Sequence, residues 1–334
     1  MFSEKLEKSF ELSLEAIQLL QNAMESSFLD AYVENVENTI DNYSVRVIDG
    51  VPNPVTTAKI EKIYQELQEI SLEREEVRKL SQLLLLKGGK TEQLQPNHQL
   101  TPDGIGFLFV YLIEQLYPKS AELKILDLTA GMGNLLLTIS LNLELAKYKS
   151  KGFGVDIDET LLAVAAANGE WTQANWQLFH QDGLQELLIE PMDVAVADLP
   201  IGFYPNDEKA ANFLVAAKDE HTYAHHLLME QSMNYVKEDG FGFFLVPSNL
   251  LETEQGACFK KLITEKVYLQ GIIQLPDELF KNEASRKSIM LLQNRSDATK
   301  QVDEVLLAKL VSLKDPSKIT QFFKQFEAWK AANV

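Results

Sequence analysis

Seven short runs of strand-forming residues constrain the fold of this chain more than any other feature of its sequence. Segments with helical spacing separate the runs, which lie at residues 124–128, 152–155, 176–179, 194–197, 241–246, 269–274 and 288–292. Apolar strands that alternate with helices are typical of parallel strands buried between two helical layers. The sequence therefore predicts an α/β fold with a mostly parallel sheet flanked by helices, and a closing helix at residues 319–331.

The first part of the chain has a different pattern, in which apolar residues recur at every third or fourth position. From Leu6 to about Asn42 this spacing predicts one long helix or two helices in series. After a turn-rich stretch at residues 49–54, Thr57 offers an N-cap for further helix up to about Leu86. This part of the chain is therefore expected to be a helical bundle.

A boundary between two domains is indicated by the glycines and lysines at residues 87–90. Glycine is common where a helix ends, so this segment predicts the end of the helical region. We expect an all-α N-terminal domain over residues 1–92 and a second domain over residues 93–334.

The composition, 46% hydrophobic and 24% charged, is that of an ordinary globular protein. No segment approaches the run of about 18 apolar residues that spans a membrane, and residues 1–11 carry no apolar signal-peptide core. The single cysteine, Cys258, cannot form an internal disulfide or a zinc site. These features predict a cytoplasmic protein without a metal site. No metal-ligand spacing is found among His180, His221, His225 and His226, which we expect to be structural or surface residues.

The net charge of −18 counts against strong unaided binding to a phosphate backbone, because such proteins usually carry a basic excess. Local patches can matter more than the total. We interpret a group of cations in the last third of the chain as solvated helix and loop charges. The group comprises Lys260, Lys261, Lys266, Lys281, Arg286 and Lys287.

The first predicted strand leads into a glycine loop at residues 129–134, which reads Thr-Ala-Gly-Met-Gly-Asn. In an open α/β sheet, ligands bind beyond the carboxyl ends of the strands. Gly131 and Gly133 let the backbone turn tightly and approach a ligand, and the helix that follows presents its positive amino end. The third glycine of a dinucleotide fingerprint would fall at Leu136, so the loop is of another kind.

Aspartates follow the next two predicted strands. Asp156 is placed to accept hydrogen bonds from both hydroxyls of a ribose. Asp158 is expected to cap the helix that begins near Glu159. Asp182, after the third strand, could accept a hydrogen bond from the exocyclic amine of a cofactor adenine.

The fourth strand ends in Asp198-Leu199-Pro200-Ile201, which we interpret as the catalytic segment. A carboxylate and a rigid backbone carbonyl at a strand end can hold an amino group by its two N–H bonds. The nitrogen lone pair is then aimed at an electrophilic methyl group. This chemistry works by positioning and electrostatics, and it needs no metal and no covalent intermediate.

Together these segments resemble the motifs of class I S-adenosylmethionine-dependent methyltransferases. The Asp198-Leu199-Pro200-Ile201 segment stands where amino methyltransferases carry (D/N/S)-P-P-(Y/F), and residues 97–102 are similar to the T-P segment of gamma-type adenine methyltransferases. Residues 240–249 and 272–280 look like the modification subunits of type I restriction systems. The helical front domain and the chain length suit the YtxK-type relatives of those subunits.

The resemblance implies a Rossmann-like catalytic domain over residues 93–334 and S-adenosyl-L-methionine as cofactor. It implies a catalytic segment that consists of Asp198, Leu199, Pro200 and Ile201. It also implies a cofactor-binding set made of Thr101, Pro102, Asp127, Thr129, Ala130, Gly131, Gly133, Asn134, Leu135, Asp156, Ile157, Asp182, Gly183 and Asp198.

Two positions of the catalytic segment depart from the family pattern. Leu199 replaces the first proline, and Ile201 replaces the aromatic residue on which a flipped adenine stacks. The loss of a stacking face costs on the order of 1 to 3 kcal/mol per base. Phe203 or Tyr204 could supply that face instead.

Three functions remain open from the sequence. The first is methylation of adenine N6 in DNA. The second keeps methyl transfer but changes the acceptor to RNA or a protein side-chain amide. The third is a module that binds the cofactor without turnover. Because the chain is acidic and shows no sequence-reading domain, the resemblance implies either a separate specificity partner or a substrate other than duplex DNA.

Overall fold

The computed structural model describes residues 3–92, 95–120, 122–218 and 220–333. In this part of the chain the strands form one sheet with the order β3-β2-β1-β4-β5-β7-β6-β8. All described pairings are parallel except those of β7 with β5 and β6. The predicted mostly parallel sheet with flanking helices is therefore confirmed.

Each of the seven predicted runs is a strand, and one further strand, β8, was not predicted. The strands are β1 (Glu122–Asp127), β2 (Lys149–Asp156), β3 (Trp176–His180), β4 (Met192–Asp198), β5 (Val236–Pro247), β6 (Val267–Gln274), β7 (Lys287–Asn294) and β8 (Leu306–Lys309). Strand β8 has four residues whose burial alternates, which is too short a pattern to stand out in a sequence. The chain divides into two compact units.

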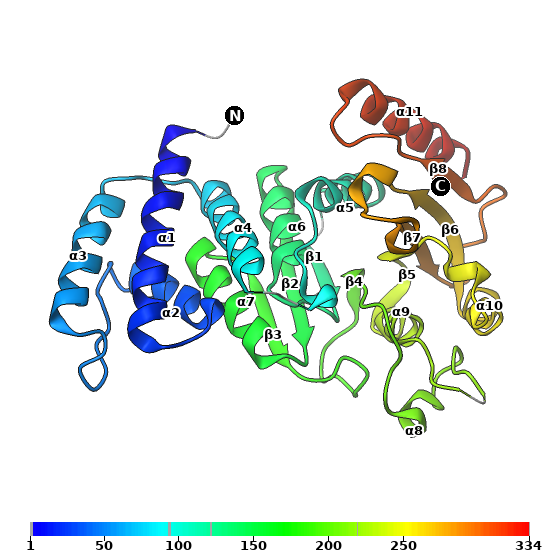
Figure 1. Ribbon diagram of the computed structural model, residues 1–334. Coiled ribbons are helices and arrows are strands. Elements are labelled where there is room, and N and C mark those ends of the chain that lie inside the picture. The colour runs from blue at the N-terminus through cyan, green and yellow to red at the C-terminus, as the bar shows by residue number, and fades with distance from the viewer. Residues whose placement is uncertain (1–2, 93–94, 121, 219, 334) are drawn as a thin grey trace. The chain divides into compact units, whose positions relative to one another are not determined.

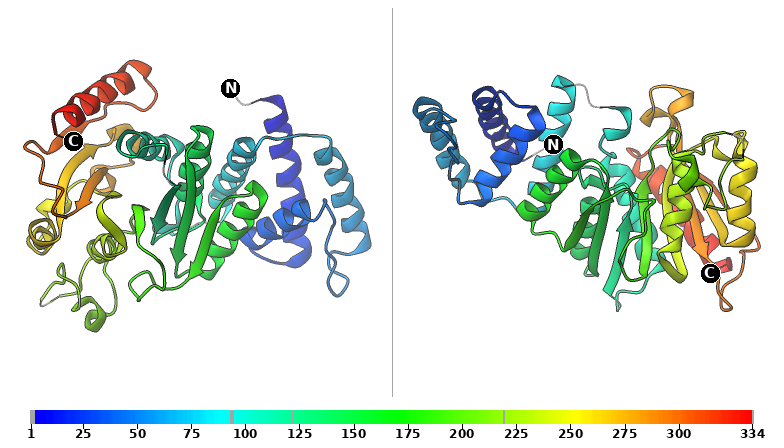
Figure 2. Two further views of the ribbon diagram at one scale, coloured as in Figure 1. Left: turned by 180° about the vertical axis from the view of Figure 1, so that it is seen from behind. Right: turned by 90° about the horizontal axis from the view of Figure 1, so that it is seen from below.

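Unit 1 comprises residues 1–121 and 130–180. Its helices are α1 (Glu4–Met24), α2 (Phe28–Ile40), α3 (Pro54–Gln68), α4 (Arg74–Thr91), η1 (Pro96–His98), α5 (Asp103–Leu116), α6 (Asn134–Leu145) and α7 (Glu159–Thr172). The four N-terminal helices, blue to cyan in Figure 1, pack on one another, and the views of Figure 2 show the same bundle. Their buried apolar cluster also includes Met132, Leu161 and Val164. The helical bundle and the helix α7 thus share one core.

The first helical stretch is two helices in series, one of the two predicted alternatives, because Glu25 adopts φ 51° and Ser27 then caps α2. The boundaries of the N-terminal helices differ from the predictions in two places. The N-cap of α3 is Asn53 rather than Thr57, because its side chain accepts from two backbone N–H groups and Pro54 follows at the first helical position. Helix α4 continues to Thr91, so the predicted end at residues 87–90 was wrong.

Gly88 explains why α4 carries glycine without ending there. A Cβ atom at this position would lie 2.2 Å from a ring carbon of Phe28. The glycine therefore permits α2 to approach α4 closely, and packing outweighs its poor helix propensity. A glycine selected for close approach looks the same in a sequence as one that ends a helix.

Unit 2 comprises residues 122–129 and 181–334. Its helices are α8 (Asp207–Ala210), α9 (Ala224–Asn234), η2 (Leu250–Glu252), α10 (Gly256–Glu265), η3 (Asp277–Leu279), η4 (Glu283–Ser285) and α11 (Pro316–Asn333). The closing helix was predicted, and its Phe322, Phe326 and Trp329 are buried as it packs on β8. Among the described residues, no helix is long and apolar enough to cross a membrane.

Candidate functional site

The glycine loop of unit 1 is held by the end of β2. The Ala130 N–H donates to the Val155 carbonyl, 3.0 Å away, and the Gly131 N–H donates to Asp156 Oδ2, 2.6 Å away. Gly131 and Gly133 adopt φ of 52° and 78°, in the left-handed region that favours glycine. The loop conformation thus depends on both glycines and on the Asp156 carboxylate.

The surroundings of the loop fit a ligand that approaches the backbone. A Cβ atom at Gly131 would meet nothing within 4 Å, so this turn faces open space. The half-buried Asp156 lies beside the turn, and the neighbouring Ile157 side chain is 67% exposed. An acidic group next to an exposed apolar side chain suits the ribose and the base of an adenosyl group, which is the group the resemblance implies.

The T-P segment lies against the same loop. The Thr101 carbonyl accepts a hydrogen bond from Asn134 Nδ2 at 2.7 Å, and Thr101 is buried while Pro102 is exposed. Asn134 is the first residue of α6 and directly follows Gly133, whereas Leu135 is buried in the core. Two segments that are 33 positions apart in the sequence are therefore joined in unit 1.

Asp158 caps α7, as predicted, because its Oδ1 accepts from the Leu161 N–H at 3.0 Å. Asp156 has a second contact here, since its Oδ1 accepts from the Asp158 N–H at 2.9 Å. The carboxylate of Asp156 therefore braces the backbone on both sides of the strand end.

In unit 2, Asp127 and Asp182 also hold backbone. The Asp127 side chain is buried, and its Oδ1 accepts from the N–H and the hydroxyl of Thr129. Asp182 Oδ1 accepts from the Leu184 N–H at 2.9 Å. Close packing fixes Gly183, where a Cβ atom would lie 2.9 Å from the Leu128 carbonyl oxygen.

Tyr204 and Lys209 occupy the other oxygen of Asp182. The Tyr204 hydroxyl donates to Asp182 Oδ2 at 2.7 Å, and Lys209 Nζ lies 3.3 Å from the same atom. Burial, with the nearby Asp182 carboxylate, raises the pKa of Tyr204. Its hydroxyl therefore stays protonated and donates to Asp182, which ties the Tyr204 ring to that side chain.

Asp198 ends β4 and forms an ion pair with Lys287, the first residue of β7, at 2.5 Å. The two side chains are largely buried, so our interpretation of Lys287 as a solvated surface charge was wrong. Nothing in the sequence indicates the pairing, since 89 positions separate the two residues. The antiparallel pairing of β7 with β5, beside β4, brings them together.

The rest of the candidate catalytic segment is anchored differently at each residue. The Leu199 N–H donates to the Leu245 carbonyl at 3.2 Å, and the Leu199 side chain is fully buried. The backbone of Pro200 is hydrogen-bonded by His225. The Ile201 side chain is exposed. The segment is thus held by hydrogen bonds at Leu199 and Pro200, and it reaches the solvent at Ile201.

A ladder of aromatic and histidine rings lies behind this segment. The rings of Phe203 and Tyr223 stack at 4.7 Å, Tyr223 stacks on His225 at 5.1 Å, and His226 meets His225 edge to face at 4.8 Å. Phe203 is 54% exposed, and it also meets the exposed His221 ring at 6.5 Å. Desolvation lowers the pKa of His225 to about 4 and that of His226 to about 3. Both histidines are therefore neutral at pH 7.

Comparisons with known proteins cover nearly the whole chain. Residues 91–328 match the family described as N-6 DNA methylase, and residues 7–89 match the YtxK N-terminal helical domain. The uncharacterized protein YtxK of Bacillus subtilis (strain 168) is 37% identical over 322 residues, which are 96% of each chain.

Two crystal structures extend this result. A provisionally assigned class I S-adenosylmethionine-dependent methyltransferase from Listeria monocytogenes has a TM-score of 0.89 and 38% identity, covering 98% of this chain and 99% of that one. The second structure is the methyltransferase subunit of a type I restriction-modification system from Streptococcus thermophilus. It has a TM-score of 0.65 and 14% identity, and the match covers 95% of this chain and 74% of that one. The second likeness is one of fold alone.

Proposed function

The chain belongs to the N-6 DNA methylase family of class I methyltransferases, and from this premise we propose that it methylates adenine N6 in DNA. The observation that carries the proposal is the Asp198-Leu199-Pro200-Ile201 segment. It stands at the carboxyl end of β4, within the region that matches the family, and it places a carboxylate and a backbone carbonyl side by side in the chain.

S-adenosyl-L-methionine would supply an electrophilic methyl group on a sulfonium. We propose that Asp156 accepts from its ribose hydroxyls, that the backbone at Gly131 and the residues Thr101 and Pro102 contact its methionine end, and that Asp182 accepts from its adenine amine. The open space at Gly131 and the bonds that hold Asp156 and Thr101 in place support the first two roles.

The acceptor amine would donate one hydrogen to Asp198 and the other to the Leu199 carbonyl. A carboxylate has about four lone-pair positions, so Asp198 can accept from the amine while it stays paired with Lys287. The new nitrogen–carbon bond would form as the methyl–sulfur bond of the sulfonium breaks, which would leave a neutral thioether and move the positive charge to the nitrogen. The Asp198 carboxylate, fixed beside that position, would stabilise the charge until the nitrogen loses its proton to water.

Phe203 is the proposed stacking residue for the target base. It is exposed and supported from behind by Tyr223, whereas Tyr204 is held by its bond to Asp182. An aromatic face of this kind contributes about 1 to 3 kcal/mol per base. Phe203 would thus replace the aromatic residue that Ile201 lacks.

A separate protein is proposed to select the DNA sequence. The net charge of −18 disfavours tight unaided contact with phosphates, and the chain has no evident sequence-reading domain. This arrangement agrees with the similarity of fold to the methyltransferase subunit of a type I restriction-modification system.

Product analysis tests the proposed acceptor. The protein and S-adenosylmethionine are incubated with unmethylated DNA, with total RNA and with a protein extract, and each fraction is digested for mass spectrometry. We expect N6-methyldeoxyadenosine in the DNA digest. A methylated ribonucleoside or a methylated side-chain amide would move the activity to another acceptor. Cofactor binding without any methylated product would make the chain a binding module.

A further inference from the structure

We propose that the N-terminal helical domain positions the two segments that hold the cofactor, acting through Arg78 on α4 and Tyr32 on α2. The inference rests on the proposed cofactor roles of the T-P segment and of the glycine loop. All residues involved lie in unit 1.

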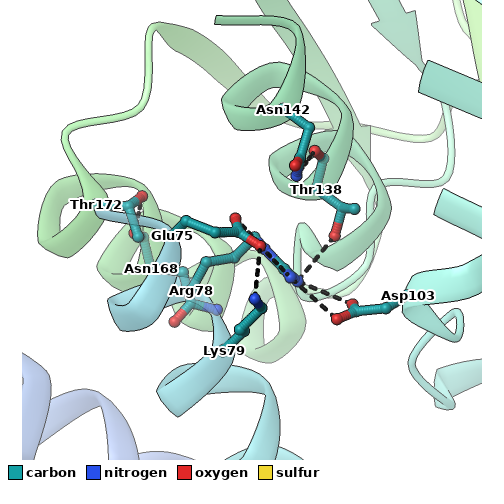
Figure 3. A network of polar contacts seen from close by, with 8 residues as sticks. All are labelled: Glu75, Arg78, Lys79, Asp103, Thr138, Asn142, Asn168 and Thr172. Atoms are coloured by element: carbon teal, nitrogen blue, oxygen red, sulfur yellow. Dashed lines mark hydrogen bonds and ion pairs between the residues drawn. The ribbon is translucent and has the colours of Figure 1, made fainter. Parts of the chain in front are cut away.

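Arg78 joins the helical domain to the residue that follows the T-P segment (Figure 3). Its side chain is 1% exposed, and its guanidinium donates to both oxygens of Asp103 at 2.9 and 3.0 Å. It also donates to both oxygens of Glu75 at 2.8 Å. Asp103 begins α5 directly after Thr101 and Pro102. The guanidinium therefore fixes the point at which the T-P segment enters its helix.

The same guanidinium reaches the helix that follows the glycine loop. Arg78 Nη1 donates to the Thr138 hydroxyl at 3.1 Å, and Thr138 lies one turn beyond Asn134 on α6. Asn134 in turn holds the Thr101 carbonyl. Arg78 thus contacts both helices whose first residues flank the proposed cofactor site.

Tyr32 provides a second connection, to the glycine loop itself. Its buried hydroxyl donates to Asn168 Oδ1, and the Ser81 hydroxyl donates to the same oxygen at 2.8 Å. Asn168 lies on α7, and its Nδ2 donates to the Met132 carbonyl at 3.3 Å. Met132 stands between Gly131 and Gly133. Side chains from α2 and α4 thus hold Asn168 in the orientation that reaches the loop.

Burial makes both connections sensitive to small changes. A buried guanidinium is tolerated only when its donors are satisfied, and a buried amide needs its partners for the same reason. The groups that contact a ligand must be held within about half an ångström of their productive positions, and the surrounding residues hold them there. Arg78 and Tyr32 are accordingly positioning residues, which act through Asp103 and Asn168.

Two conservative variants test the inference, each with a matched control. Tyr32→Phe removes one hydroxyl, and Asp103→Asn weakens the pair with Arg78 while Glu75 remains. The control for the first is Tyr64→Phe, because the Tyr64 hydroxyl is also buried and also contacts asparagines, Asn35 and Asn38, which both lie on α2 within the helical bundle. The control for the second is Arg74→Met, which removes contacts of the same helix to the C-terminal ends of α6 and α7.

The readout is the Kd of the full-length protein for labelled S-adenosylmethionine, by equilibrium dialysis at 25 °C, with the Tm of each variant. We expect Tyr32→Phe and Asp103→Asn to raise Kd about 3- to 30-fold, the range for residues that couple through a network. Tyr64→Phe and Arg74→Met should lower Tm at most and leave Kd unchanged. A purely structural role would shift Tm in all four variants and Kd in none.

The inference is overturned if Tyr32→Phe binds the cofactor as tightly as the wild type, or if Tyr64→Phe weakens binding equally. Tyr32→Phe decides the matter alone should Asp103→Asn fail to fold. No acceptor is needed, so failure to methylate DNA would count against the proposed function and leave this result standing. A wild-type protein that does not bind S-adenosylmethionine would contradict both.

Discussion

At the scale of single residues, the carboxylates at the strand ends lie where a ligand is expected. They also accept hydrogen bonds from the backbone of the loops around them. Asp156 shows this best, because it braces Gly131 and Asp158 together. Its type and place were predictable from the sequence. Its bond to the glycine loop was not, because the two residues are 25 positions apart.

Asp156→Ala should weaken S-adenosylmethionine binding by about 1 to 3 kcal/mol, the cost of losing a charge-assisted acceptor. Equilibrium dialysis measures the change. Asp158→Ala is the matched control, since it removes the cap of α7, costs about 1 kcal/mol of stability and leaves affinity intact. Unchanged affinity in Asp156→Ala would show that the ribose assignment is wrong.

Lys287 holds the Asp198 carboxylate in place, so Lys287→Met should lower kcat on the order of 10-fold through misplacement of that group. The Kd for S-adenosylmethionine should stay the same, because Lys287 is given no role in cofactor binding. The exposed Lys281→Met, nearby in the sequence, serves as control. A kcat that is equal to or higher than that of the wild type would mean that Lys287 does not position Asp198.

At the scale of elements, α9 carries two buried histidines behind the candidate catalytic segment. Neither ring nitrogen of His226 has a partner among the described residues. Their folded pKa values, about 4 for His225 and about 3 for His226, lie below the ordinary value of 6.5. Their stabilising effect is therefore complete above pH 6.5 and is lost as the pH falls toward 4 and then 3, because the unfolded chain takes up protons first.

Denaturant unfolding between pH 7 and pH 5 measures this effect. Below pH 6.5 the free energy of unfolding should fall by up to about 1.4 kcal/mol per pH unit for each of the two histidines. His226→Leu should reduce the slope and cost little at pH 7, since it removes a buried polar ring that has no described hydrogen-bond partner. An equal slope in the variant and the wild type would contradict the assignment.

The sequence predicted the elements far better than their limits. Among the described residues, apolar periodicity located each strand except β8, because burial in the core imposes that pattern. It could not decide the role of Gly88, which serves Phe28 rather than a helix end. The cap of α3 was predicted at Thr57, because Asn53 stands next to Pro54 in a stretch that looks like a loop in the sequence.

At the scale of the whole molecule, the family and the segments of the candidate site could be predicted from the sequence, whereas the long-range pairings could not. Asp198 was predicted as a site residue from its strand and its motif, but its partner Lys287 comes from another strand. Tyr32 and Asn168 are 136 positions apart, and no local pattern indicates their contact. The topology of the fold determines which distant residues meet, and a single sequence is a poor guide to topology.

The most direct test of the central claim is transfer of tritium from methyl-labelled S-adenosylmethionine into unmethylated genomic DNA. The wild type is compared with Asp198→Ala and with Asp207→Ala, which alters an exposed carboxylate at the start of α8. We predict incorporation by the wild type and by Asp207→Ala, and its loss in Asp198→Ala, with cofactor binding largely retained in all three. Equal incorporation in Asp198→Ala, or none by a wild type that binds the cofactor, would contradict the claim.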